Sequence, residues 1–351
     1  MHKVTLNTKN SISTILIDNQ IKGCLLDYIN KDIDKILIIT DSNLACIYAD
    51  YFTQLQESFA QKNITSHLYT IRAGERSKTL ETHKAICLKL AELSFTRSDC
   101  VLSVGGGVVT DIGGFVASTF MRGIAWISMP TTLLGMVDAS IGGKCGVNLE
   151  SGKNLVGSFY QPDYIFIDPD FLSTLSEKEF NCGIAEVIKY GVIADKSLFK
   201  LLDNVKENIK EIIIKSVEIK VKVVESDEKE SLARMVLNFG HTFGHIIEKI
   251  GNYTLFSHGE SVAYGMRLEA EMLKKLGLVN DNKVIDELTA KFNLNINPAL
   301  SKVDLIRNVF GDKKMRGDYL YFAGYSEIGK AKIYKFTKDD ILSGINQLFS
   351  D

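Results

Sequence analysis

Residues 100–111 read Cys100-Val101-Leu102-Ser103-Val104-Gly105-Gly106-Gly107-Val108-Val109-Thr110-Asp111, an apolar, β-branched run that passes directly into three glycines. Glycines let the backbone turn sharply and approach a ligand without a Cβ, and a helix that starts after them directs free amides at an anion. The pattern predicts a strand, a turn and a helix that cradle a dinucleotide pyrophosphate. The spacing is not Gly-x-Gly-x-x-Gly, so a tight structural turn stays an alternative, as does a helix-capping role for Asp111.

Short apolar runs on either side of this stretch indicate a parallel sheet. They occur at residues 36–40, 125–129 and 164–167, and the segments between them are long enough for crossover helices. Near-continuous apolar strands are typical of a sheet covered by helices on both faces. A hairpin-like start at residues 4–17 adds strands. We therefore expect an NAD-binding α/β domain, Rossmann-like with a mostly parallel sheet, over residues 1–175.

Further along the chain the sequence becomes helical. Ser176 is placed to cap the amide of Glu179, with the Glu179 side chain reaching back, so a helix should begin there. Apolar residues recur at helical spacing between residues 198 and 217, which is typical of an amphipathic helix packed on a core. We expect a second, mainly α-helical domain over residues 176–351 that binds metal and substrate.

The composition excludes several classes of protein. The chain has 351 residues, 45% hydrophobic and 24% charged, with 4 Pro and 27 Gly, which argues against collagenous or disordered proteins. Its 41 Lys+Arg balance 43 Asp+Glu and form no long basic block, so nucleic acid is not an expected partner. Because no signal peptide and no long apolar run appear, we expect a cytoplasmic protein without membrane association, whose six cysteines are reduced.

A second glycine-dense region carries lysines, in Gly142-Gly143-Lys144 and Gly152-Lys153-Asn154. Glycines beside lysines combine backbone access with mobile positive charge, which suits a phosphate or a developing oxyanion. Solvated lysines in a flexible loop are the alternative. That alternative is weakened because Thr131, Thr132 and Asp138 continue the same polar string inside otherwise apolar sequence.

Two segments of the second half carry residues of the kind that bind metal ions. Glu186 and Lys189 lie three apart on one helical face, where a surface ion pair is the alternative. His241 and His245 lie four apart, and His258 follows after enough chain to return. A histidine pair with a third histidine and a carboxylate forms a nitrogen and oxygen site that stays open to substrate. Spacing alone does not choose between His241 and His245, and any one histidine alone would fit the core or the surface.

Together these features indicate an enzyme that oxidises an alcohol. A metal bound to a substrate hydroxyl lowers its pKa while a nicotinamide accepts the hydride. Cationic side chains indicate an anionic substrate, although most lysines of any protein are merely solvated. These cations are Lys78, Arg122, Lys144, Lys153, Lys189, Lys220, Arg234, Lys313 and Lys314.

An ordered series of motifs runs through about residues 70–320. The motifs are Gly105-Gly106-Gly107-Val108-Val109 with Asp111, Met121-Arg122-Gly123, Pro130-Thr131-Thr132-Leu133-Leu134, Gly142-Gly143-Lys144, Gly152-Lys153-Asn154, Ala185-Glu186-Val187-Ile188-Lys189-Tyr190-Gly191, Asn238-Phe239-Gly240-His241-Thr242-Phe243-Gly244-His245 and His258-Gly259-Glu260. Together they resemble the 3-dehydroquinate synthase family.

The resemblance implies a reaction of the shikimate pathway. It is the conversion of 3-deoxy-D-arabino-heptulosonate 7-phosphate to 3-dehydroquinate and phosphate, by transient oxidation, phosphate elimination, re-reduction, ring opening and intramolecular aldol closure. The implied cofactors are NAD, which is recycled, and a divalent metal, Zn²⁺ with Co²⁺ as the alternative.

The resemblance also implies roles for residues. Glu186, His241 and His258 match the metal ligands. The positions that match NAD contacts are Gly74, Glu75, Lys78, Gly105, Gly106, Gly107, Val108, Val109, Thr110, Asp111, Thr131, Thr132, Lys144, Lys153, Phe171, Leu172, Ser173 and Thr174. Those that match catalytic and substrate contacts are Asp138, Lys144, Asn154, Lys189, Lys220, Arg234, Asn238, His245, Lys313 and Lys314, with no choice between the last two. Arg122 matches a phosphate-binding arginine from a neighbouring subunit, so a homodimer is implied.

Three positions depart from the residues usual in the family. Thr110 stands where glycine is common, and its Cβ would shift a nucleotide bound beside it. Ala73 and Leu232 replace a usually acidic or small residue and a usual glycine. None of these departures removes a metal ligand or a charged catalytic group.

Three other functions fit part of the pattern. Another sugar-phosphate cyclase, of the aminocyclitol or valiolone type, would share the metal and nucleotide residues, but Arg234 favours a substrate that offers a carboxylate. A metal-dependent polyol dehydrogenase would consume NAD stoichiometrically and would not need the phosphate-facing lysines. A metal-sensing or nucleotide-sensing module would leave the polar string from Thr131 to Asn154 unexplained.

Overall fold

The computed structural model describes residues 1–29, 32–310, 315–316 and 318–350. They form two compact units, which are Met1–Leu175 with Lys220–Glu225, and Ser176–Ile219 with Ser226–Asp351. The first unit is therefore built from two separate stretches of the chain. Its second stretch belongs to the long helix α8 (Val205–Ser226).

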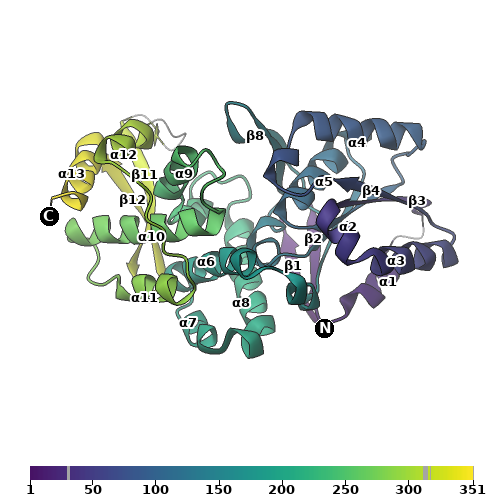
Figure 1. The fold of residues 1–351 in the computed structure, drawn as a ribbon, viewed down its shortest axis with the longest axis horizontal. Helices are drawn as coiled ribbons and strands as arrows, with labels where there is room; N and C mark the ends of the chain where they lie inside the picture. The colour runs from purple at the N-terminus through teal and green to yellow at the C-terminus, as the bar shows by residue number, and fades with distance from the viewer. Residues whose placement is uncertain (30–31, 311–314, 317, 351) are drawn as a thin grey trace. The chain divides into compact units, whose positions relative to one another are not determined.

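A seven-stranded sheet forms the centre of the first unit (Figure 1). The strand order is β1-β2-β9-β6-β5-β3-β4, and every pairing except that of β1 with β2 is parallel. The strands are β1 (His2–Asn7), β2 (Ile12–Ile17), β3 (Lys35–Asp41), β4 (Thr65–Ile71), β5 (Cys100–Gly105), β6 (Ala125–Pro130) and β9 (Tyr164–Ile167). The predicted parallel sheet and N-terminal hairpin are confirmed, whereas β4 was not predicted.

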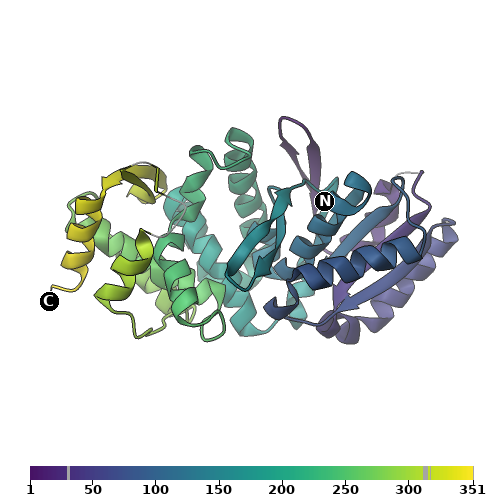
Figure 2. The ribbon, with the colours of Figure 1, turned by 90° about the horizontal axis from the view of Figure 1, so that it is seen from above.

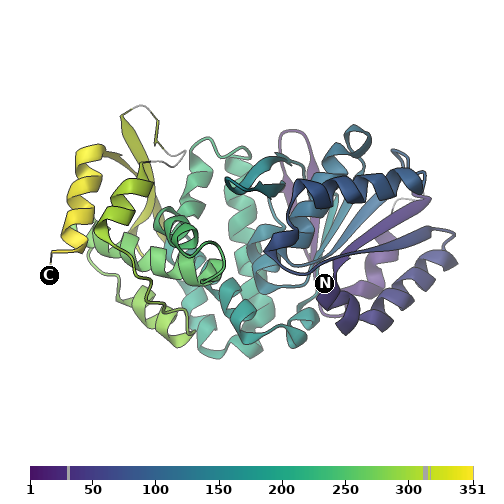
Figure 3. The same cartoon turned by 45° about the horizontal axis from the view of Figure 1, so that its top comes forward.

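Helices cover both faces of this sheet, as Figures 2 and 3 show. They are α1 (Leu25–Tyr28), α2 (Ser42–Ile47), α3 (Ala49–Gln61), α4 (Leu80–Glu92) and α5 (Gly107–Thr119). On one face, Leu90 of α4 and Ile112 of α5 pack with Val101 of β5 in a buried apolar cluster. On the other face, the Tyr51 hydroxyl of α3 donates to Met129 Sδ of β6 at 3.2 Å. The two-sided burial explains why β3, β5 and β6 read as near-continuous apolar runs.

A two-stranded hairpin, β7 (Lys144–Leu149) and β8 (Gly152–Phe159), lies outside the large sheet. Gly146 faces Gly157 across the pair, where a Cβ on Gly146 would lie 2.4 Å from the carbonyl oxygen of Val156. Val147 is fully buried in the same cluster as α5. The region is therefore a packed hairpin, and the alternative of a flexible loop is wrong.

Helices make up most of the second unit. They are α6 (Glu177–Ile193), α7 (Ser197–Leu201), most of α8, α9 (His241–Ile250), α10 (His258–Lys275), α11 (Lys283–Lys291), α12 (Lys302–Val309) and α13 (Lys338–Leu348). Ser176 caps α6 as predicted, since its Oγ accepts from the Glu179 N–H at 3.3 Å. The predicted return contact from the Glu179 side chain does not appear among the hydrogen bonds of the described residues. The mainly helical second half is thus confirmed.

A small antiparallel sheet also belongs to the second unit, in the order β10 (Met315–Arg316), β11 (Tyr319–Glu327) and β12 (Lys330–Thr337). It was not predicted. Leu320 and Phe322 of β11 are buried with Tyr334 and Phe336 of β12, so the sheet adds an apolar face to the helical core.

A helix that crosses a lipid bilayer must be both long and apolar. Within the described part of the chain, no helix meets both requirements.

Candidate active site

Most residues predicted to contact NAD follow the carboxyl ends of parallel strands. Gly74, Glu75 and Lys78 follow β4, and residues 105–111 close β5 and open α5. Thr131 and Thr132 follow β6, and residues 171–174 follow β9. We call this rim the carboxyl edge. In open α/β sheets, ligands bind outside the carboxyl ends of the strands, so the carboxyl edge is the candidate nucleotide site of the first unit.

The three-glycine turn lies against the end of the neighbouring strand β6. Thr131 N–H donates to the Gly105 carbonyl oxygen at 3.0 Å, and a Cβ on Gly106 would lie 3.0 Å from Thr132 Cγ2. A Cβ on Gly105 would meet the Val109 side chain at 2.5 Å, so packing of α5 explains that glycine. At Gly107, the atom nearest to an added Cβ would be the Cβ of Ala139, at an ordinary contact distance of 3.4 Å. Packing within the unit therefore does not explain Gly107, and a glycine here leaves room for a ligand to approach the backbone closely.

Exchanging Gly107 for alanine is expected to leave the fold intact and to weaken NAD binding by about tenfold or more, since one added methyl in a close contact costs about 1–3 kcal/mol. The measurement is a calorimetric titration of NAD into the purified protein. The matched control is Gly105→Ala, which should instead lower the unfolding temperature because its Cβ meets Val109. Equal NAD affinity in Gly107→Ala and the parent protein would contradict the assignment.

Thr110 is buried near the start of α5. It is 1% exposed, and its hydroxyl donates to the Gly107 carbonyl oxygen at 3.1 Å. The side chain is accommodated against its own helix, so the sequence departure at this position does not place a Cβ at the open surface of the turn.

Lys78 joins the carboxyl edge to the hairpin. Its buried ammonium forms an ion pair with Asp111 of α5 and donates to Asn154 Oδ1 of β8 at 2.5 Å. Asn148 of β7 donates to Glu75 Oε1 at 2.7 Å and accepts from Asn154 N–H at 2.8 Å. Burial alone would lower the pKa of Lys78, but the carboxylates of Asp111 and Glu75 outweigh it and raise that pKa above its ordinary value. Lys78 is therefore a fixed positive charge between the two elements.

The remaining predicted residues of the first unit differ in exposure. Lys220 is buried and donates to Asp138 twice, to its carbonyl oxygen at 2.5 Å and to Oδ1 at 2.7 Å. Lys144 is exposed at the first residue of β7, and Lys153 is half-buried at the second residue of β8, beside the turn of the hairpin. Arg122 is also exposed and follows Met121 in a left-handed backbone conformation, with φ values of 69° and 51°.

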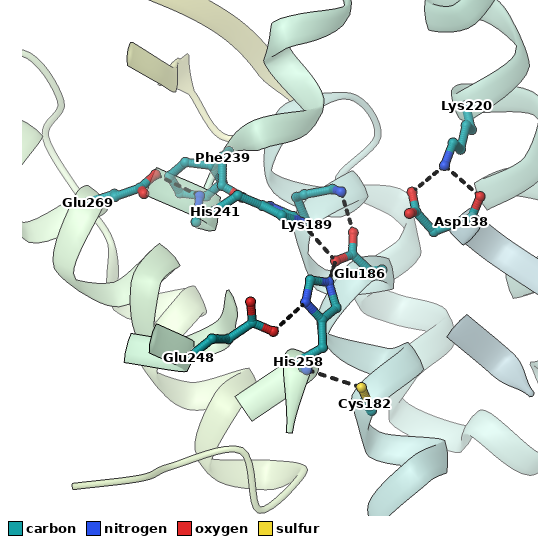
Figure 4. A network of polar contacts seen from close by, with 12 residues as sticks. Asp138, Cys182, Glu186, Lys189, Lys220, Phe239, His241, Glu248, His258 and Glu269 are labelled. Atoms are coloured by element: carbon teal, nitrogen blue, oxygen red, sulfur yellow. Dashed lines mark hydrogen bonds and ion pairs between the residues drawn. The ribbon is translucent and has the colours of Figure 1, made fainter. Parts of the chain in front are cut away.

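In the second unit, Glu186, His241 and His258 converge (Figure 4). One ligand atom from each lies within 4.8 Å of the others. Glu186 Oε1 of α6 is 3.5 Å from Nε2 of His241, the first residue of α9, and 3.5 Å from Nε2 of His258, the first residue of α10. Catalytic zinc sites typically have three protein ligands of this kind and leave a further coordination position to water or substrate. His245 lies one turn beyond His241 and is exposed, so the structure groups His241 with Glu186 and His258.

The second nitrogen of each imidazole is held by another group. His258 Nδ1 lies 3.1 Å from Glu248 Oε1, and His241 Nδ1 lies 3.2 Å from the Phe239 carbonyl oxygen. Metal-ligating histidines almost always donate their other N–H in this way, which fixes the tautomer and aims the remaining lone pair at the cation. These contacts show that the three residues fit a divalent cation.

The two histidines have opposite electrostatic surroundings. Burial lowers the pKa of His241 well below its ordinary value, which keeps this imidazole neutral. Burial acts in the same direction on His258, but the carboxylates of Glu186 and Glu248 outweigh it and raise the pKa of His258 to about 10. A cation at Nε2 would replace that proton, because metal ligands bind in their deprotonated form.

Lys189 pairs with the carboxylate ligand. Its ammonium forms an ion pair with Glu186 Oε2, and the two side chains are 1% and 0% exposed. The alternative of a surface ion pair is therefore wrong. The contact leaves Oε1 of the same carboxylate facing the two imidazoles.

The other residues predicted to contact substrate in this unit lie just before α9. Arg234 is buried and donates to the Glu228 carbonyl oxygen at 2.7 Å, and Asn238 donates to Glu230 Oε1 at 2.6 Å. Lys313 and Lys314 lie outside the described residues.

Three buried residues around the histidines were missed by the sequence analysis. They are Glu248, Glu269 and Cys182. The Glu269 carboxylate accepts hydrogen bonds from the N–H groups of Gly240 and Phe243 at the start of α9. The Cys182 sulfur accepts from Gly259 N–H at 3.0 Å. The sequence signal that could have identified Glu248 was an acidic residue within an apolar helical face. Glu248 follows Ile246 and Ile247 and lies seven residues, or two turns, beyond His241.

Comparisons with known proteins show which family the chain resembles over its length. The family models described as 3-dehydroquinate synthase N-terminal and C-terminal match residues 68–182 and 183–315. The chain is 40% identical to 3-dehydroquinate synthase of Clostridium kluyveri, over 95% of this chain and 96% of the relative. It is 39% identical to the enzyme of Caldanaerobacter subterraneus subsp. tengcongensis, over 97% and 99%.

Solved structures of other enzymes share the fold. A 2-epi-5-epi-valiolone synthase from Streptomyces hygroscopicus subsp. jinggangensis, with NAD⁺ and Zn²⁺ bound, has a TM-score of 0.86 at 25% identity, covering 97% of this chain and 98% of that one. A 2-deoxy-scyllo-inosose synthase complexed with carbaglucose-6-phosphate, NAD⁺ and Co²⁺ has a TM-score of 0.83 at 24% identity, covering 99% and 100%.

Proposed function

The chain belongs to the 3-dehydroquinate synthase family, and from this premise we infer that it converts 3-deoxy-D-arabino-heptulosonate 7-phosphate to 3-dehydroquinate and phosphate. Similarity to synthases of this activity over nearly the whole chain is the observation that carries the inference. The geometry of each unit supplies candidate residues for the chemistry.

We propose NAD and a divalent metal ion as the cofactors. The carboxyl edge, with the glycine at 107 and the free amides at the start of α5, is suited to the pyrophosphate of NAD, which supplies hydride transfer when bound. The cluster of Glu186, His241 and His258 is suited to the metal, which supplies Lewis-acid polarisation of a substrate oxygen when bound.

The charged side chains of the chain would bind and orient an anionic substrate. Arg234 offers the planar guanidinium that pairs best with a carboxylate, and Lys189 and Lys220 offer ammonium groups whose carboxylate partners hold them in place. We propose that Asp138, Lys144, Asn154, Asn238 and His245 complete the substrate contacts. A carboxylate-binding Arg234 favours the heptulosonate over a neutral sugar phosphate.

Further points of the proposal remain predictions. They are zinc as the resident metal, a cytoplasmic location, and a homodimer in which Arg122 of one subunit binds the substrate phosphate of the other. The exposure of Arg122 and its position on a sharp turn are compatible with the last of these.

Catalytic use of NAD is the sharpest test of the reaction. Purified protein given the heptulosonate phosphate and a trace of NAD is expected to release many phosphates per NAD, without accumulation of NADH. A chelator should abolish the activity, and added Zn²⁺ or Co²⁺ should restore it. Stoichiometric NADH formation would instead indicate a dehydrogenase, and turnover of a phosphorylated sugar that lacks a carboxylate would indicate another cyclase.

A further inference from the structure

His258 is held in place by two elements besides its own helix. It opens α10, where Ser257 and Glu260 form a reciprocal capping box. The N–H of the next residue, Gly259, donates to Cys182 Sγ, which lies four residues before Glu186 on α6. Its ring nitrogen Nδ1 contacts Glu248 of α9 at 3.1 Å. The backbone of His258 is thus fixed to the helix that carries Glu186, and its ring orientation is fixed by the helix that carries His241.

The acceptors behind the two histidines differ in charge. His241 Nδ1 faces a backbone carbonyl, which is neutral, whereas His258 Nδ1 faces a carboxylate that is 4% exposed. A carboxylate that accepts the N–H raises the basicity of the imidazole and stabilises the tautomer with the proton on Nδ1. The same contact leaves the Nε2 lone pair directed at Glu186 Oε1, where the cation would lie.

The charges around Glu186, His241 and His258 favour a further carboxylate behind His258. The charge of Glu186 is shared with the buried Lys189 ammonium, so this carboxylate alone offers a divalent cation little net negative charge. Both imidazoles are neutral when they bind a metal. A buried anion one side chain behind His258 adds the missing negative charge without occupying a position around the metal.

We propose that Glu248 is a positioning residue of the metal site: its carboxylate fixes the tautomer and ring orientation of His258 and strengthens the Nε2–metal contact. The inference rests on the metal site proposed above. It assigns to α9 two separate functions, because this helix carries one ligand at its first turn and the support of a second ligand two turns later.

The test is the metal affinity of Glu248 variants, measured by competition with a chromophoric chelator for Zn²⁺. Glu248→Ala is expected to weaken binding about 10–100-fold, as loss of an outer-shell partner typically does. Glu248→Gln should recover part of this loss, because the amide oxygen still accepts from Nδ1–H although the charge is gone. With Co²⁺, the visible absorption bands should change in Glu248→Ala, which a merely structural role would not produce.

The matched control is Glu271→Gln. Glu271 lies on α10, is half-buried and accepts from Asn282 at 3.0 Å, so its replacement removes a comparable charge away from the histidines. Metal affinity in this variant should equal that of the parent. Unchanged affinity and an unchanged cobalt spectrum in Glu248→Ala, or equal weakening in Glu271→Gln, would overturn the proposal.

A reference variant separates the inference from the proposed metal site. His258→Ala should lose tight metal binding altogether. If it does and Glu248→Ala does not, the ligand set stands and the role of Glu248 fails. If His258→Ala keeps its metal, the proposed site itself fails.

Discussion

Exchanging Glu186 for glutamine is expected to remove the bound metal and to lower the free energy of unfolding by about 3–5 kcal/mol. The metal is lost because an amide oxygen is a much weaker ligand than a carboxylate. The stability is lost because the substitution leaves the buried Lys189 ammonium beside a neutral amide. Urea denaturation in the presence of chelator measures the stability, and elemental analysis of the dialysed protein measures the metal content.

The double variant Glu186→Gln/Lys189→Met separates these two effects. It removes both charges, so most of the stability should return while the metal remains absent. Lys189→Met alone should unfold more readily in chelator than with metal, because the cation then becomes the partner of the carboxylate. A Glu186→Gln protein that retains stoichiometric metal would show that this carboxylate is not the ligand. One that is as stable as the parent in chelator would show that the ion pair with Lys189 contributes little to stability.

Gly259→Ala is expected to weaken metal binding more than tenfold, roughly, and to lower the free energy of unfolding of the second unit by about 1–3 kcal/mol. A Cβ at this position would lie 2.4 Å from Cys182 Cα and 2.6 Å from its carbonyl oxygen. Both are backbone atoms of α6, so the start of α10 must move away, and His258 moves with it. Metal affinity and thermal unfolding measure the two consequences.

Cys182→Ala is the control for this variant. It removes the sulfur that accepts the Gly259 N–H but not the backbone atoms, so it should cost only about 0.5–1.5 kcal/mol, as for an ordinary hydrogen bond. For the same reason, combining it with Gly259→Ala should not restore the metal affinity. Parent-like affinity in Gly259→Ala would mean that the close contact of α6 with α10 does not position His258.

The parts of the fold with a strong local pattern were predictable. Strands β3, β5, β6 and β9 are buried on both faces, so their sequences are near-continuously apolar. Strand β4 was missed because Ser66, His67 and Thr70 interrupt its apolar pattern, at a position on the edge of the sheet. Strand β12 was missed although the buried Tyr334 and Phe336 alternate with the exposed Lys335, since its lysines resemble those of a solvated helix.

The glycines of the hairpin β7–β8 concealed its two strands in the sequence. Glycine usually weakens a strand, so no strand was predicted around Gly142-Gly143-Lys144 and Gly152-Lys153-Asn154, and a flexible loop stayed an alternative. In the structure, Gly146 and Gly157 are paired because the two backbones approach too closely for any side chain. That requirement depends on the partner strand and is absent from local sequence.

The metal site was predictable in kind but not in detail. Three histidines and a glutamate predicted the site, but the spacing left the choice between His241 and His245 open, because both lie on one helical face. Only the packing of α10 against both α9 and α6 shows that His241 faces Glu186 while His245 is exposed. Glu248 was missed because an acidic residue near a helix end usually contacts solvent.

The discontinuous make-up of the first unit limits how the protein can be dissected. A truncated chain that stops at Leu175 would lack Lys220–Glu225, and with them the ammonium that binds Asp138 and the carboxylate that accepts from Asn7 N–H at 2.7 Å. Expression of that fragment as a stand-alone nucleotide binder should therefore yield a less stable product. During translation, the same unit reaches its final contacts only after the ribosome has passed residue 225.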